Sequence, residues 1–308
     1  MPATANPKLS RLLNKVPEVT AIFWIIKILS TTVGETGADY LAVHVGLGAS
    51  TTAAIMVGFL IVALGMQLRA RSYIPWTYWL MVVLVSVVGT QITDLLTDKL
   101  EISLYLSTAV FAGVLAAIFA IWYGVEQTLS IHTIVTRRRE LFYWAAILFT
   151  FALGTAAGDL ATEALGLGFQ VGVIVFAVLI AAIAFAYYLG ADPVLTFWLA
   201  YILTRPLGAS LGDLLSQSRN YGGAGLGTVY TSFAFLTVIV ALVARVSFER
   251  ERAGKADPAA IREALVTTKM PSMLGTVIDF DDHNLAHNNA IILTIKGGKV
   301  VVLGMSKT

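Results

Sequence analysis

The chain of 308 residues is 57% hydrophobic and 13% charged, with a mean hydropathy of +0.78. A soluble domain carries about 25% charged residues, so this composition excludes an ordinary water-soluble protein and indicates several membrane spans. The formal net charge of +2 singles out no partner, and the lack of cysteine excludes disulfides, thiol nucleophiles and cysteine-held metals.

Eight apolar runs are long enough to cross a bilayer, which takes about 20 residues per helix. In chain order they lie near residues 20–43, 51–68, 75–97, 103–126, 141–165, 169–190, 193–216 and 227–246. A short basic segment without a small-residue cleavage site precedes the first run, so we expect that run to be a retained spanning helix.

A pattern of fixed spacing opens every second run: an aromatic residue, Trp, Gly ten residues after the Trp, and Asp five residues after the Gly. Its four copies are Phe23-Trp24…Gly34…Asp39, Tyr78-Trp79…Gly89…Asp94, Tyr143-Trp144…Gly154…Asp159 and Phe197-Trp198…Gly208…Asp213. The pattern predicts four repeats of two helices each. Because each repeat has an even number of spans, every copy starts on the same side of the membrane, which makes these parallel repeats.

The repeats also pair into two similar four-helix halves. Residues 34–48 align with 154–168, both ending in Gly-Leu-Gly, and 89–97 aligns with 208–216. The resulting division is 1–19 N-terminal segment, 20–126 first half, 127–140 basic loop, 141–246 second half and 247–308 soluble tail. We therefore predict an all-α membrane protein with a small C-terminal α/β tail, in which a helix near 259–268 precedes strands at 275–280 and 290–304.

Basic residues gather in alternate connections, and the positive-inside rule then places both termini in the cytoplasm. They are Lys8, Arg11, Lys15, Arg69, Arg71, Arg137, Arg138, Arg139, Arg245, Arg250 and Arg252. The four repeat tryptophans lie near the same helix ends. We expect these rings to anchor the helices at the headgroup boundary rather than to stack on a ligand.

The repeat aspartates Asp39, Asp94, Asp159 and Asp213 fall inside or near the outer ends of spans. A carboxylate at membrane depth costs about 2.5–3.5 kcal/mol on insertion scales, so four equivalent ones predict a shared polar site. The acids are doubled at i, i+4, which adds Glu35 and Asp98 as a second layer and pairs Glu163 with Asp159.

Hydroxyls stand close to these acids in the sequence, at Ser30, Thr31, Thr150 and Thr204, with His44 as the one nearby nitrogen donor. Such an oxygen-rich set suits Mg²⁺, Mn²⁺, Ca²⁺ or protons rather than soft metals. The alternative is structural: the acids cap helices and pair with bases near the outer surface.

Two further features have both a structural and a functional interpretation. The repeat glycines either let helices pack closely, which we favour, or mark helix breaks that free carbonyls. Gly208 is the exception, because Arg205-Pro206 just before it predicts a kink. The bases within spans are Lys27 and Arg205, which we expect to form ion pairs with acids, although displacement by a cation or contact with an anionic substrate stays open.

No nucleotide-binding loop of GxxxxGK[ST] type, HExxH or GxSxG occurs, so we expect no enzyme activity, no bound cofactor and no nucleic-acid partner. The repeated pattern, with KVPEVT at 15–20 before it, resembles a family of bacterial multi-spanning proteins labelled only as membrane-anchored. That resemblance covers about residues 15–250 and implies an inner-membrane location without implying a substrate.

Two other likenesses are narrower. The tail is similar to the last segment of periplasmic branched-chain amino-acid or amide binding proteins, which implies a fused remnant that lacks the ligand-binding lobes. Bacterial manganese and calcium exporters also place acidic motifs in duplicated halves, but their glutamate–glycine–aspartate signature is absent here, so that link is an analogy.

These observations predict a transporter that exchanges a small cation, with Mn²⁺ as the first guess, for protons. The repeat aspartates would hold the cation, while lipid, the cation and protons would be the partners, and a homo-oligomer is compatible with the sequence. Two alternatives stay open: a non-transporting scaffold or sensor with structural acids, and a carrier of a small organic cation that uses aromatic walls.

Overall fold

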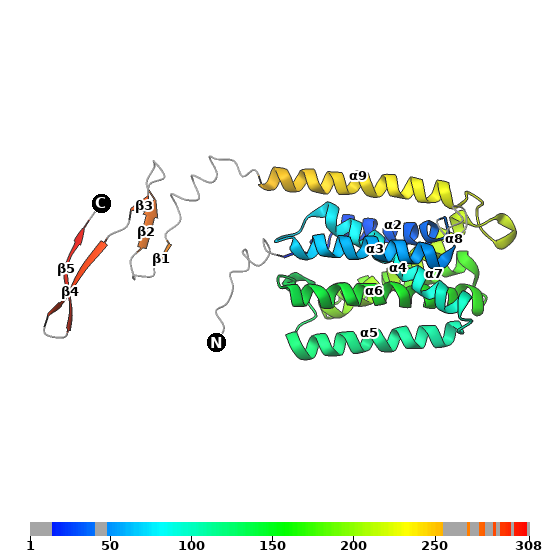
Figure 1. Ribbon diagram of the computed structural model, residues 1–308, viewed down its shortest axis with the longest axis horizontal. Coiled ribbons are helices and arrows are strands. Elements are labelled where there is room, and N and C mark those ends of the chain that lie inside the picture. The colour runs from blue at the N-terminus through cyan, green and yellow to red at the C-terminus, as the bar shows by residue number, and fades with distance from the viewer. Residues whose placement is uncertain are drawn as a thin grey trace. The chain divides into compact units, whose positions relative to one another are not determined.

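The computed structural model describes residues 14–40 and 48–254, and five short strands beyond them (Figure 1). The described helices are α2 (Ala21–Asp39), α3 (Ala49–Arg69), α4 (Pro75–Asp94), α5 (Leu104–Glu126), α6 (Arg137–Asp159), α7 (Gly168–Tyr188), α8 (Pro193–Ser216) and α9 (Thr228–Gly254). Short helical turns join some of them: the π-helical η2 (Leu95–Lys99) and η4 (Leu160–Ala164), and the 3₁₀ turns η3 (Ile131–Thr133) and η5 (Arg219–Tyr221).

Seven of the described helices, α3 to α9, are long and apolar enough to cross a bilayer, which indicates a multi-pass membrane protein. The remaining predicted span, the one at 20–43, corresponds to α2 and is not among them. It holds Lys27 and Glu35 within 19 residues, and both side chains are buried inside the bundle rather than exposed at its surface.

The first helix of each repeat contributes to a closed inner ring. Helix α2 packs on α4, α4 on α6, α6 on α8, and α8 returns to α2. In α4, α6 and α8, between 56% and 61% of the most apolar stretch is buried, against 11% to 17% in α3, α5, α7 and α9. The outer helices therefore present the apolar surface, and the inner four form the core.

Each outer helix rests on the inner helix of the following repeat, which interlocks the repeats. Helix α3 packs on α4, α5 on α6 and α7 on α8, and the helices run side by side along the bundle (Figure 1). The last outer helix touches the first inner helix, where Ser232 in α9 lies 2.6 Å from the Thr36 hydroxyl in α2.

Local sequence explains where the inner helices begin. Pro75 and Pro193 occupy first-turn positions, where a missing N–H is harmless, and Asp192 accepts hydrogen bonds from two first-turn amides of α8. Thr136 caps α6 by accepting from the Arg139 amide at 3.3 Å. The predicted basic loop 127–140 consequently ends at Thr136, and its three arginines form the first turn of α6.

The repeat glycines allow the inner helices to cross at close range. A Cβ added to Gly34 would lie 1.8 Å from the Ser86 hydroxyl, and one on Gly154 would lie 2.5 Å from the Arg205 Cβ. The same holds for Gly89 against Phe151 and for Gly208 against Thr31. Each glycine thus faces the next repeat around the ring, which confirms the packing interpretation.

The chain divides into two compact units, Met1–Ser247 and Phe248–Thr308. In the second unit the strands are β1 (Met270–Pro271), β2 (Val277–Phe280), β3 (Ala286–His287), β4 (Ala290–Lys296) and β5 (Lys299–Ser306). Antiparallel pairing joins β1 to β2, β2 to β3 and β4 to β5. The helix predicted at 259–268 lies outside the described residues, so the α/β character of the tail stays a prediction.

Candidate functional site

One face of each inner helix carries five positions that lie 11, 7 and 3 residues before the repeat glycine and 1 and 5 residues after it. We call these positions the inner stripe. Steps of four residues place them one turn apart on one side of a helix. The stripes are Phe23–Lys27–Thr31–Glu35–Asp39, Tyr78–Val82–Ser86–Thr90–Asp94, Tyr143–Ile147–Phe151–Thr155–Asp159 and Phe197–Tyr201–Arg205–Ala209–Asp213. None of the twelve residues in the three middle turns is more than 8% exposed.

The first turn of the stripes forms a closed belt of aromatic rings. Each stripe aromatic meets its own Trp and also the Trp of the next repeat around the ring. The cross-repeat centroid distances are 5.6 Å for Phe23–Trp79, 5.4 Å for Tyr78–Trp144, 6.2 Å for Tyr143–Trp198 and 5.7 Å for Phe197–Trp24. The hydroxyls of Tyr78 and Tyr143 lie 2.5 Å apart and are hydrogen-bonded.

This belt shows that the prediction of interfacial anchors is wrong for Trp79, Trp144 and Trp198, which are only 3% to 4% exposed. Trp24 is partly exposed. The cross-repeat pairs are tilted, with interplanar angles of 45° to 58°, and their centroid distances fall in the range of favourable ring contacts. The ring pairs therefore join neighbouring repeats to one another instead of fixing the helices at the headgroups.

Lys27 extends into the second turn without a carboxylate partner. Its Nζ lies 4.1 Å from the ring centre of Phe151 in α6 and 4.3 Å from that of Tyr201 in α8. The side chain is 1% exposed, and Nζ makes no hydrogen bond within the described part of the chain. The predicted Lys27–carboxylate pair is therefore wrong, because the amine lies between two aromatic faces.

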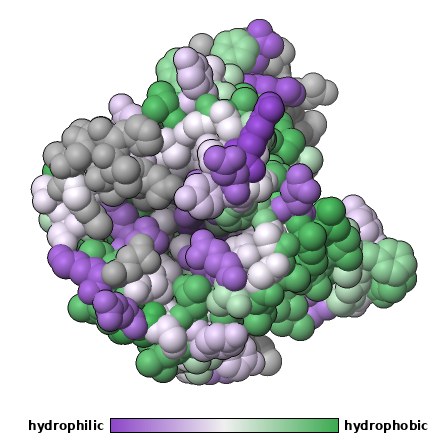
Figure 2. Space-filling view, turned by 90° about the vertical axis from the view of Figure 1, so that its right-hand side faces the viewer, coloured by the Kyte–Doolittle hydropathy of each residue, from purple (hydrophilic) through white to green (hydrophobic). Residues whose placement is uncertain are grey.

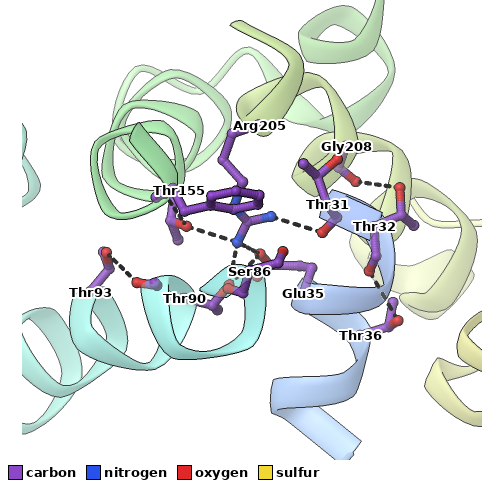
Figure 3. A network of polar contacts seen from close by, with 12 residues as sticks. Thr31, Thr32, Glu35, Thr36, Ser86, Thr90, Thr93, Thr155, Arg205 and Gly208 are labelled. Carbon is purple, nitrogen blue, oxygen red and sulfur yellow. Dashed lines mark hydrogen bonds and ion pairs between the residues drawn. The ribbon is translucent and has the colours of Figure 1, made fainter. Parts of the chain in front are cut away.

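The Arg205 guanidinium donates hydrogen bonds to polar groups of the third and fourth turns, and we call this set of contacts the Arg205 network (Figure 3). Its Nη2 lies 2.6 Å from the Glu35 carboxylate and 2.8 Å from the Thr155 hydroxyl, and it also donates to the Thr90 hydroxyl. Its Nη1 donates to the Thr31 carbonyl at 3.0 Å. The guanidinium on α8 thus contacts α2, α4 and α6 together, and its side chain is fully buried.

Three of the four positions that follow the repeat glycine meet at this one guanidinium: Glu35, Thr90 and Thr155. The fourth is Ala209, whose small side chain lies on the same helix as Arg205. The sequence had predicted an ion pair for Arg205 but had singled out neither threonine. The repeat itself could have predicted these two threonines, because the residue that follows each repeat glycine occupies an equivalent position in every copy.

The aspartate turn lies at the opposite end of the ring from the aromatic belt. Asp39, Asp94 and Asp159 are the last residues of α2, α4 and α6, and Asp213 falls in the last turn of α8. Asp94, Asp159 and Asp213 are partly buried. Figure 2 looks onto the end of the bundle where these helices finish, and hydrophilic residues lie over the middle of it.

A π-helical turn follows Asp94 and Asp159, in η2 and η4. Such turns are rare and often mark functional positions. Glu163 lies within η4, and its predicted pairing with Asp159 stays a prediction. Asp98 lies within η2, and its side chain, like that of Asp39, lies outside the description.

Among the side chains that the structure describes, no three histidine, aspartate or glutamate groups are placed to hold an ion. The side chains of Asp39 and Asp98 are not among those described, so the metal centre stays a prediction. Glu35 is engaged by Arg205. The predicted hydroxyls Ser30, Thr150 and Thr204 donate to carbonyls of their own helices instead of joining the acids. His44 lies outside the described residues.

A second buried ion pair, which the sequence did not predict, lies at the belt end of the ring. Lys15 lies 2.7 Å from Glu140 in α6, and the side chains are 6% and 1% exposed. Gln67 donates to the other Glu140 oxygen at 3.0 Å, and the Lys15 amide donates to the Ile134 carbonyl at 3.0 Å. Lys15 was predicted to be a loop charge, but it ties the N-terminal segment to the bundle.

Comparison with known proteins identifies one family. Residues 22–73, 77–128, 142–190 and 196–251 each match a family described as "Repeat of Unknown Function (DUF347)". The four matched segments correspond to the four repeats, each holding one inner and one outer helix. No curated protein and no solved structure matches the chain.

Proposed function

This chain belongs to the DUF347 repeat family, and we propose that it is an integral membrane transporter that exchanges a small cation for protons, with Mn²⁺ as the first candidate. The path would follow the inner ring of α2, α4, α6 and α8. The observation that carries the proposal is the position of the repeat aspartates, one at the C-terminal end of each of these four helices.

Helix ends strengthen the attraction of this turn for cations. The inner helices are parallel, since every repeat contains an even number of helices, so four C-terminal ends meet at one end of the ring. Each such helix carries a partial negative charge of roughly half an elementary charge at its C-terminal end, which for α4 and α6 lies one π-helical turn beyond the aspartate, in η2 and η4. Four carboxylates at the same end add to that field, which favours a hard cation such as Mn²⁺ over an anion.

Glu35 supplies a means of exchange one turn deeper than the aspartates. Its carboxylate is held by Arg205 at 2.6 Å, and a proton or an arriving cation would compete for the same oxygens. Lys27 and Arg205 add positive charge in the inner turns, which opposes the passage of an unpaired cation. This arrangement favours stepwise exchange over an open pore.

We place the protein in the bacterial inner membrane with both termini in the cytoplasm. The support is the distribution of basic residues, which follow the outer helices at Arg69 and Arg71 and open α6 at Arg137 to Arg139. On this orientation the aromatic belt faces the cytoplasmic side, and the aspartate turn faces outward.

Transport of Mn²⁺ into proteoliposomes under an imposed pH gradient tests the proposal. We expect uptake by the wild type and loss of uptake in a variant that combines Asp94→Asn, Asp159→Asn and Asp213→Asn. Asp192→Asn is the matched control, because asparagine caps a helix as well as aspartate does and Asp192 is exposed at the N-terminal end of α8, at the other end from the aspartate turn. Full uptake by the triple variant would overturn the proposal.

A non-transporting scaffold is the second candidate, and the Arg205 network favours it. A guanidinium that joins all four inner helices is what a purely structural core needs. On that account the asparagine variants would melt earlier, and neither Mn²⁺ nor a small organic cation, such as choline, would cross the membrane. Equal stability of variant and wild type, with transport lost, would exclude the scaffold.

A further inference from the structure

Four buried polar atoms on the inner stripes make no hydrogen bond within the described part of the chain. They are the Lys27 Nζ, the Tyr201 hydroxyl, the Ser86 hydroxyl and the Arg205 Nε. All four side chains are at most 1% exposed. Buried polar groups are hydrogen-bonded in the large majority of cases, so four donors on two successive turns require an explanation.

These side chains occupy neighbouring turns of the stripes, next to the aromatic belt on one side and the Glu35 turn on the other. Lys27 and Tyr201 occupy the second turn of their stripes, and Ser86 and Arg205 occupy the third. The Phe151 ring links the turns, because its centre lies 4.1 Å from the Lys27 Nζ and 5.8 Å from the Arg205 Cζ.

The charges in this region do not balance. When its amine is protonated, Lys27 adds a second positive charge to that of Arg205, and Glu35 in the fourth turn returns one negative charge. Ionisable groups within a membrane bundle pair with one another, because an uncompensated charge at that depth is strongly unfavourable. A single negative charge beside Lys27 would complete the pairing.

We propose that the inner ring binds a small monovalent anion, the size of chloride, between Lys27 and Arg205. The anion accepts hydrogen bonds from the Lys27 ammonium and from the Tyr201 and Ser86 hydroxyls, all of which are able to donate. It also balances the charge that Glu35 leaves uncompensated. The site goes beyond the proposed cation exchange and needs no divalent cation.

Thermal unfolding of the purified full-length protein in detergent tests the site. The melting temperature is measured while sodium chloride replaces sodium gluconate at constant ionic strength, without divalent cations. An anion that binds only the folded protein raises the melting temperature with concentration and saturates. We expect such a rise with chloride and bromide, and equilibrium dialysis with radiolabelled chloride to give one bound anion per chain.

Variants locate the anion. Lys27→Met keeps the length of the side chain without its charge, and we expect it to lose the chloride-dependent rise whatever its own baseline. Lys99→Met is the matched control, because Lys99 is exposed and hydrogen-bonded to Ser50 at 2.5 Å. It should respond to chloride as the wild type does.

Tyr201→Phe removes a single hydroxyl and covers the case in which Lys27→Met does not fold. We expect it to weaken chloride binding several-fold with little change in the gluconate baseline. A wild-type melting temperature that is the same in chloride and gluconate would overturn the proposal. So would a Lys27→Met protein that retains the full chloride response. Failure of Mn²⁺ transport would leave this result untouched, because no divalent cation is present.

Discussion

Arg205 in α8 reaches the Glu35 carboxylate in α2 at 2.6 Å, across 170 residues of chain. The pair joins the last repeat to the first, so it closes the ring in the same way as Gly208 against Thr31 and Phe197 against Trp24. Thr90 and Thr155 complete the contact from the two repeats between them. One guanidinium therefore couples all four repeats.

We predict that Arg205→Met destabilises the protein by about 3–5 kcal/mol, because it leaves the Glu35 carboxylate buried without a counter-charge. The double variant Glu35→Gln/Arg205→Met should lose less, since both charges are removed together. Unfolding in a denaturing detergent series measures both. A double variant that is as unstable as the sum of the single variants would show that Glu35 and Arg205 act independently.

We predict that Gly154→Ala destabilises the bundle by about 1–3 kcal/mol, the usual range for overpacking. The added methyl would lie 2.5 Å from the Arg205 Cβ and 3.1 Å from the Pro206 Cδ, so α6 and α8 must separate. The same detergent titration compares it with Gly113→Ala in α5.

Gly113 is the matched control because an added Cβ there meets nothing within 4 Å. Alanine favours the helix by roughly 0.5–1 kcal/mol over glycine, so Gly113→Ala should be neutral or slightly stabilising. Equal losses for both variants would contradict the close crossing of α6 and α8.

We predict that Glu140→Gln releases the N-terminal segment. The change removes the negative charge that pairs with the buried Lys15 ammonium, and it leaves one amide oxygen to accept from both Lys15 and Gln67. Limited proteolysis should then cleave near residues 14–20 faster than in the wild type. Glu101→Gln, in an exposed loop position, should change nothing. Unaltered cleavage of Glu140→Gln would argue against the buried pair.

We predict that Trp144→Ala costs about 3–5 kcal/mol, the range for removing a large buried aromatic side chain. Trp144 packs on Tyr78 at a centroid distance of 5.4 Å and is 4% exposed. Trp76→Ala, at a position 48% exposed, is the control and should have a small effect on unfolding. A headgroup anchor would instead make the two variants alike.

Much of the fold could be predicted from the sequence. Runs of apolar residues marked the helices within a few residues, because bilayer thickness fixes the length of a span. The largest differences came at polar boundaries: Thr136 starts α6 earlier than predicted, and α9 continues to Gly254 through a charged stretch that hydropathy had assigned to the tail.

The candidate site was less predictable, and Lys27 shows why. Its spacing from Glu35 suggested an ion pair along one helix, but its nearest neighbours are Phe151 and Tyr201 from helices more than 100 residues away. The sequence predicted the site at the aspartates because they are charged residues within spans. The contacts of Arg205 are instead completed by two neutral residues, Thr90 and Thr155. Composition could not reveal those partners.

The sequence by itself determined the repeat and the approximate bounds of the helices described between residues 21 and 254, because both depend on spacing along one chain. It left open whether the repeat glycines pack helices or break them. Only the tertiary structure decided that the inner helices close into a ring, that the tryptophans are buried, and that Arg205 meets Glu35. Those outcomes depend on which faces of separate helices pack together. A single stripe shows which side of a helix is polar, but its partner is set by the geometry of the whole ring.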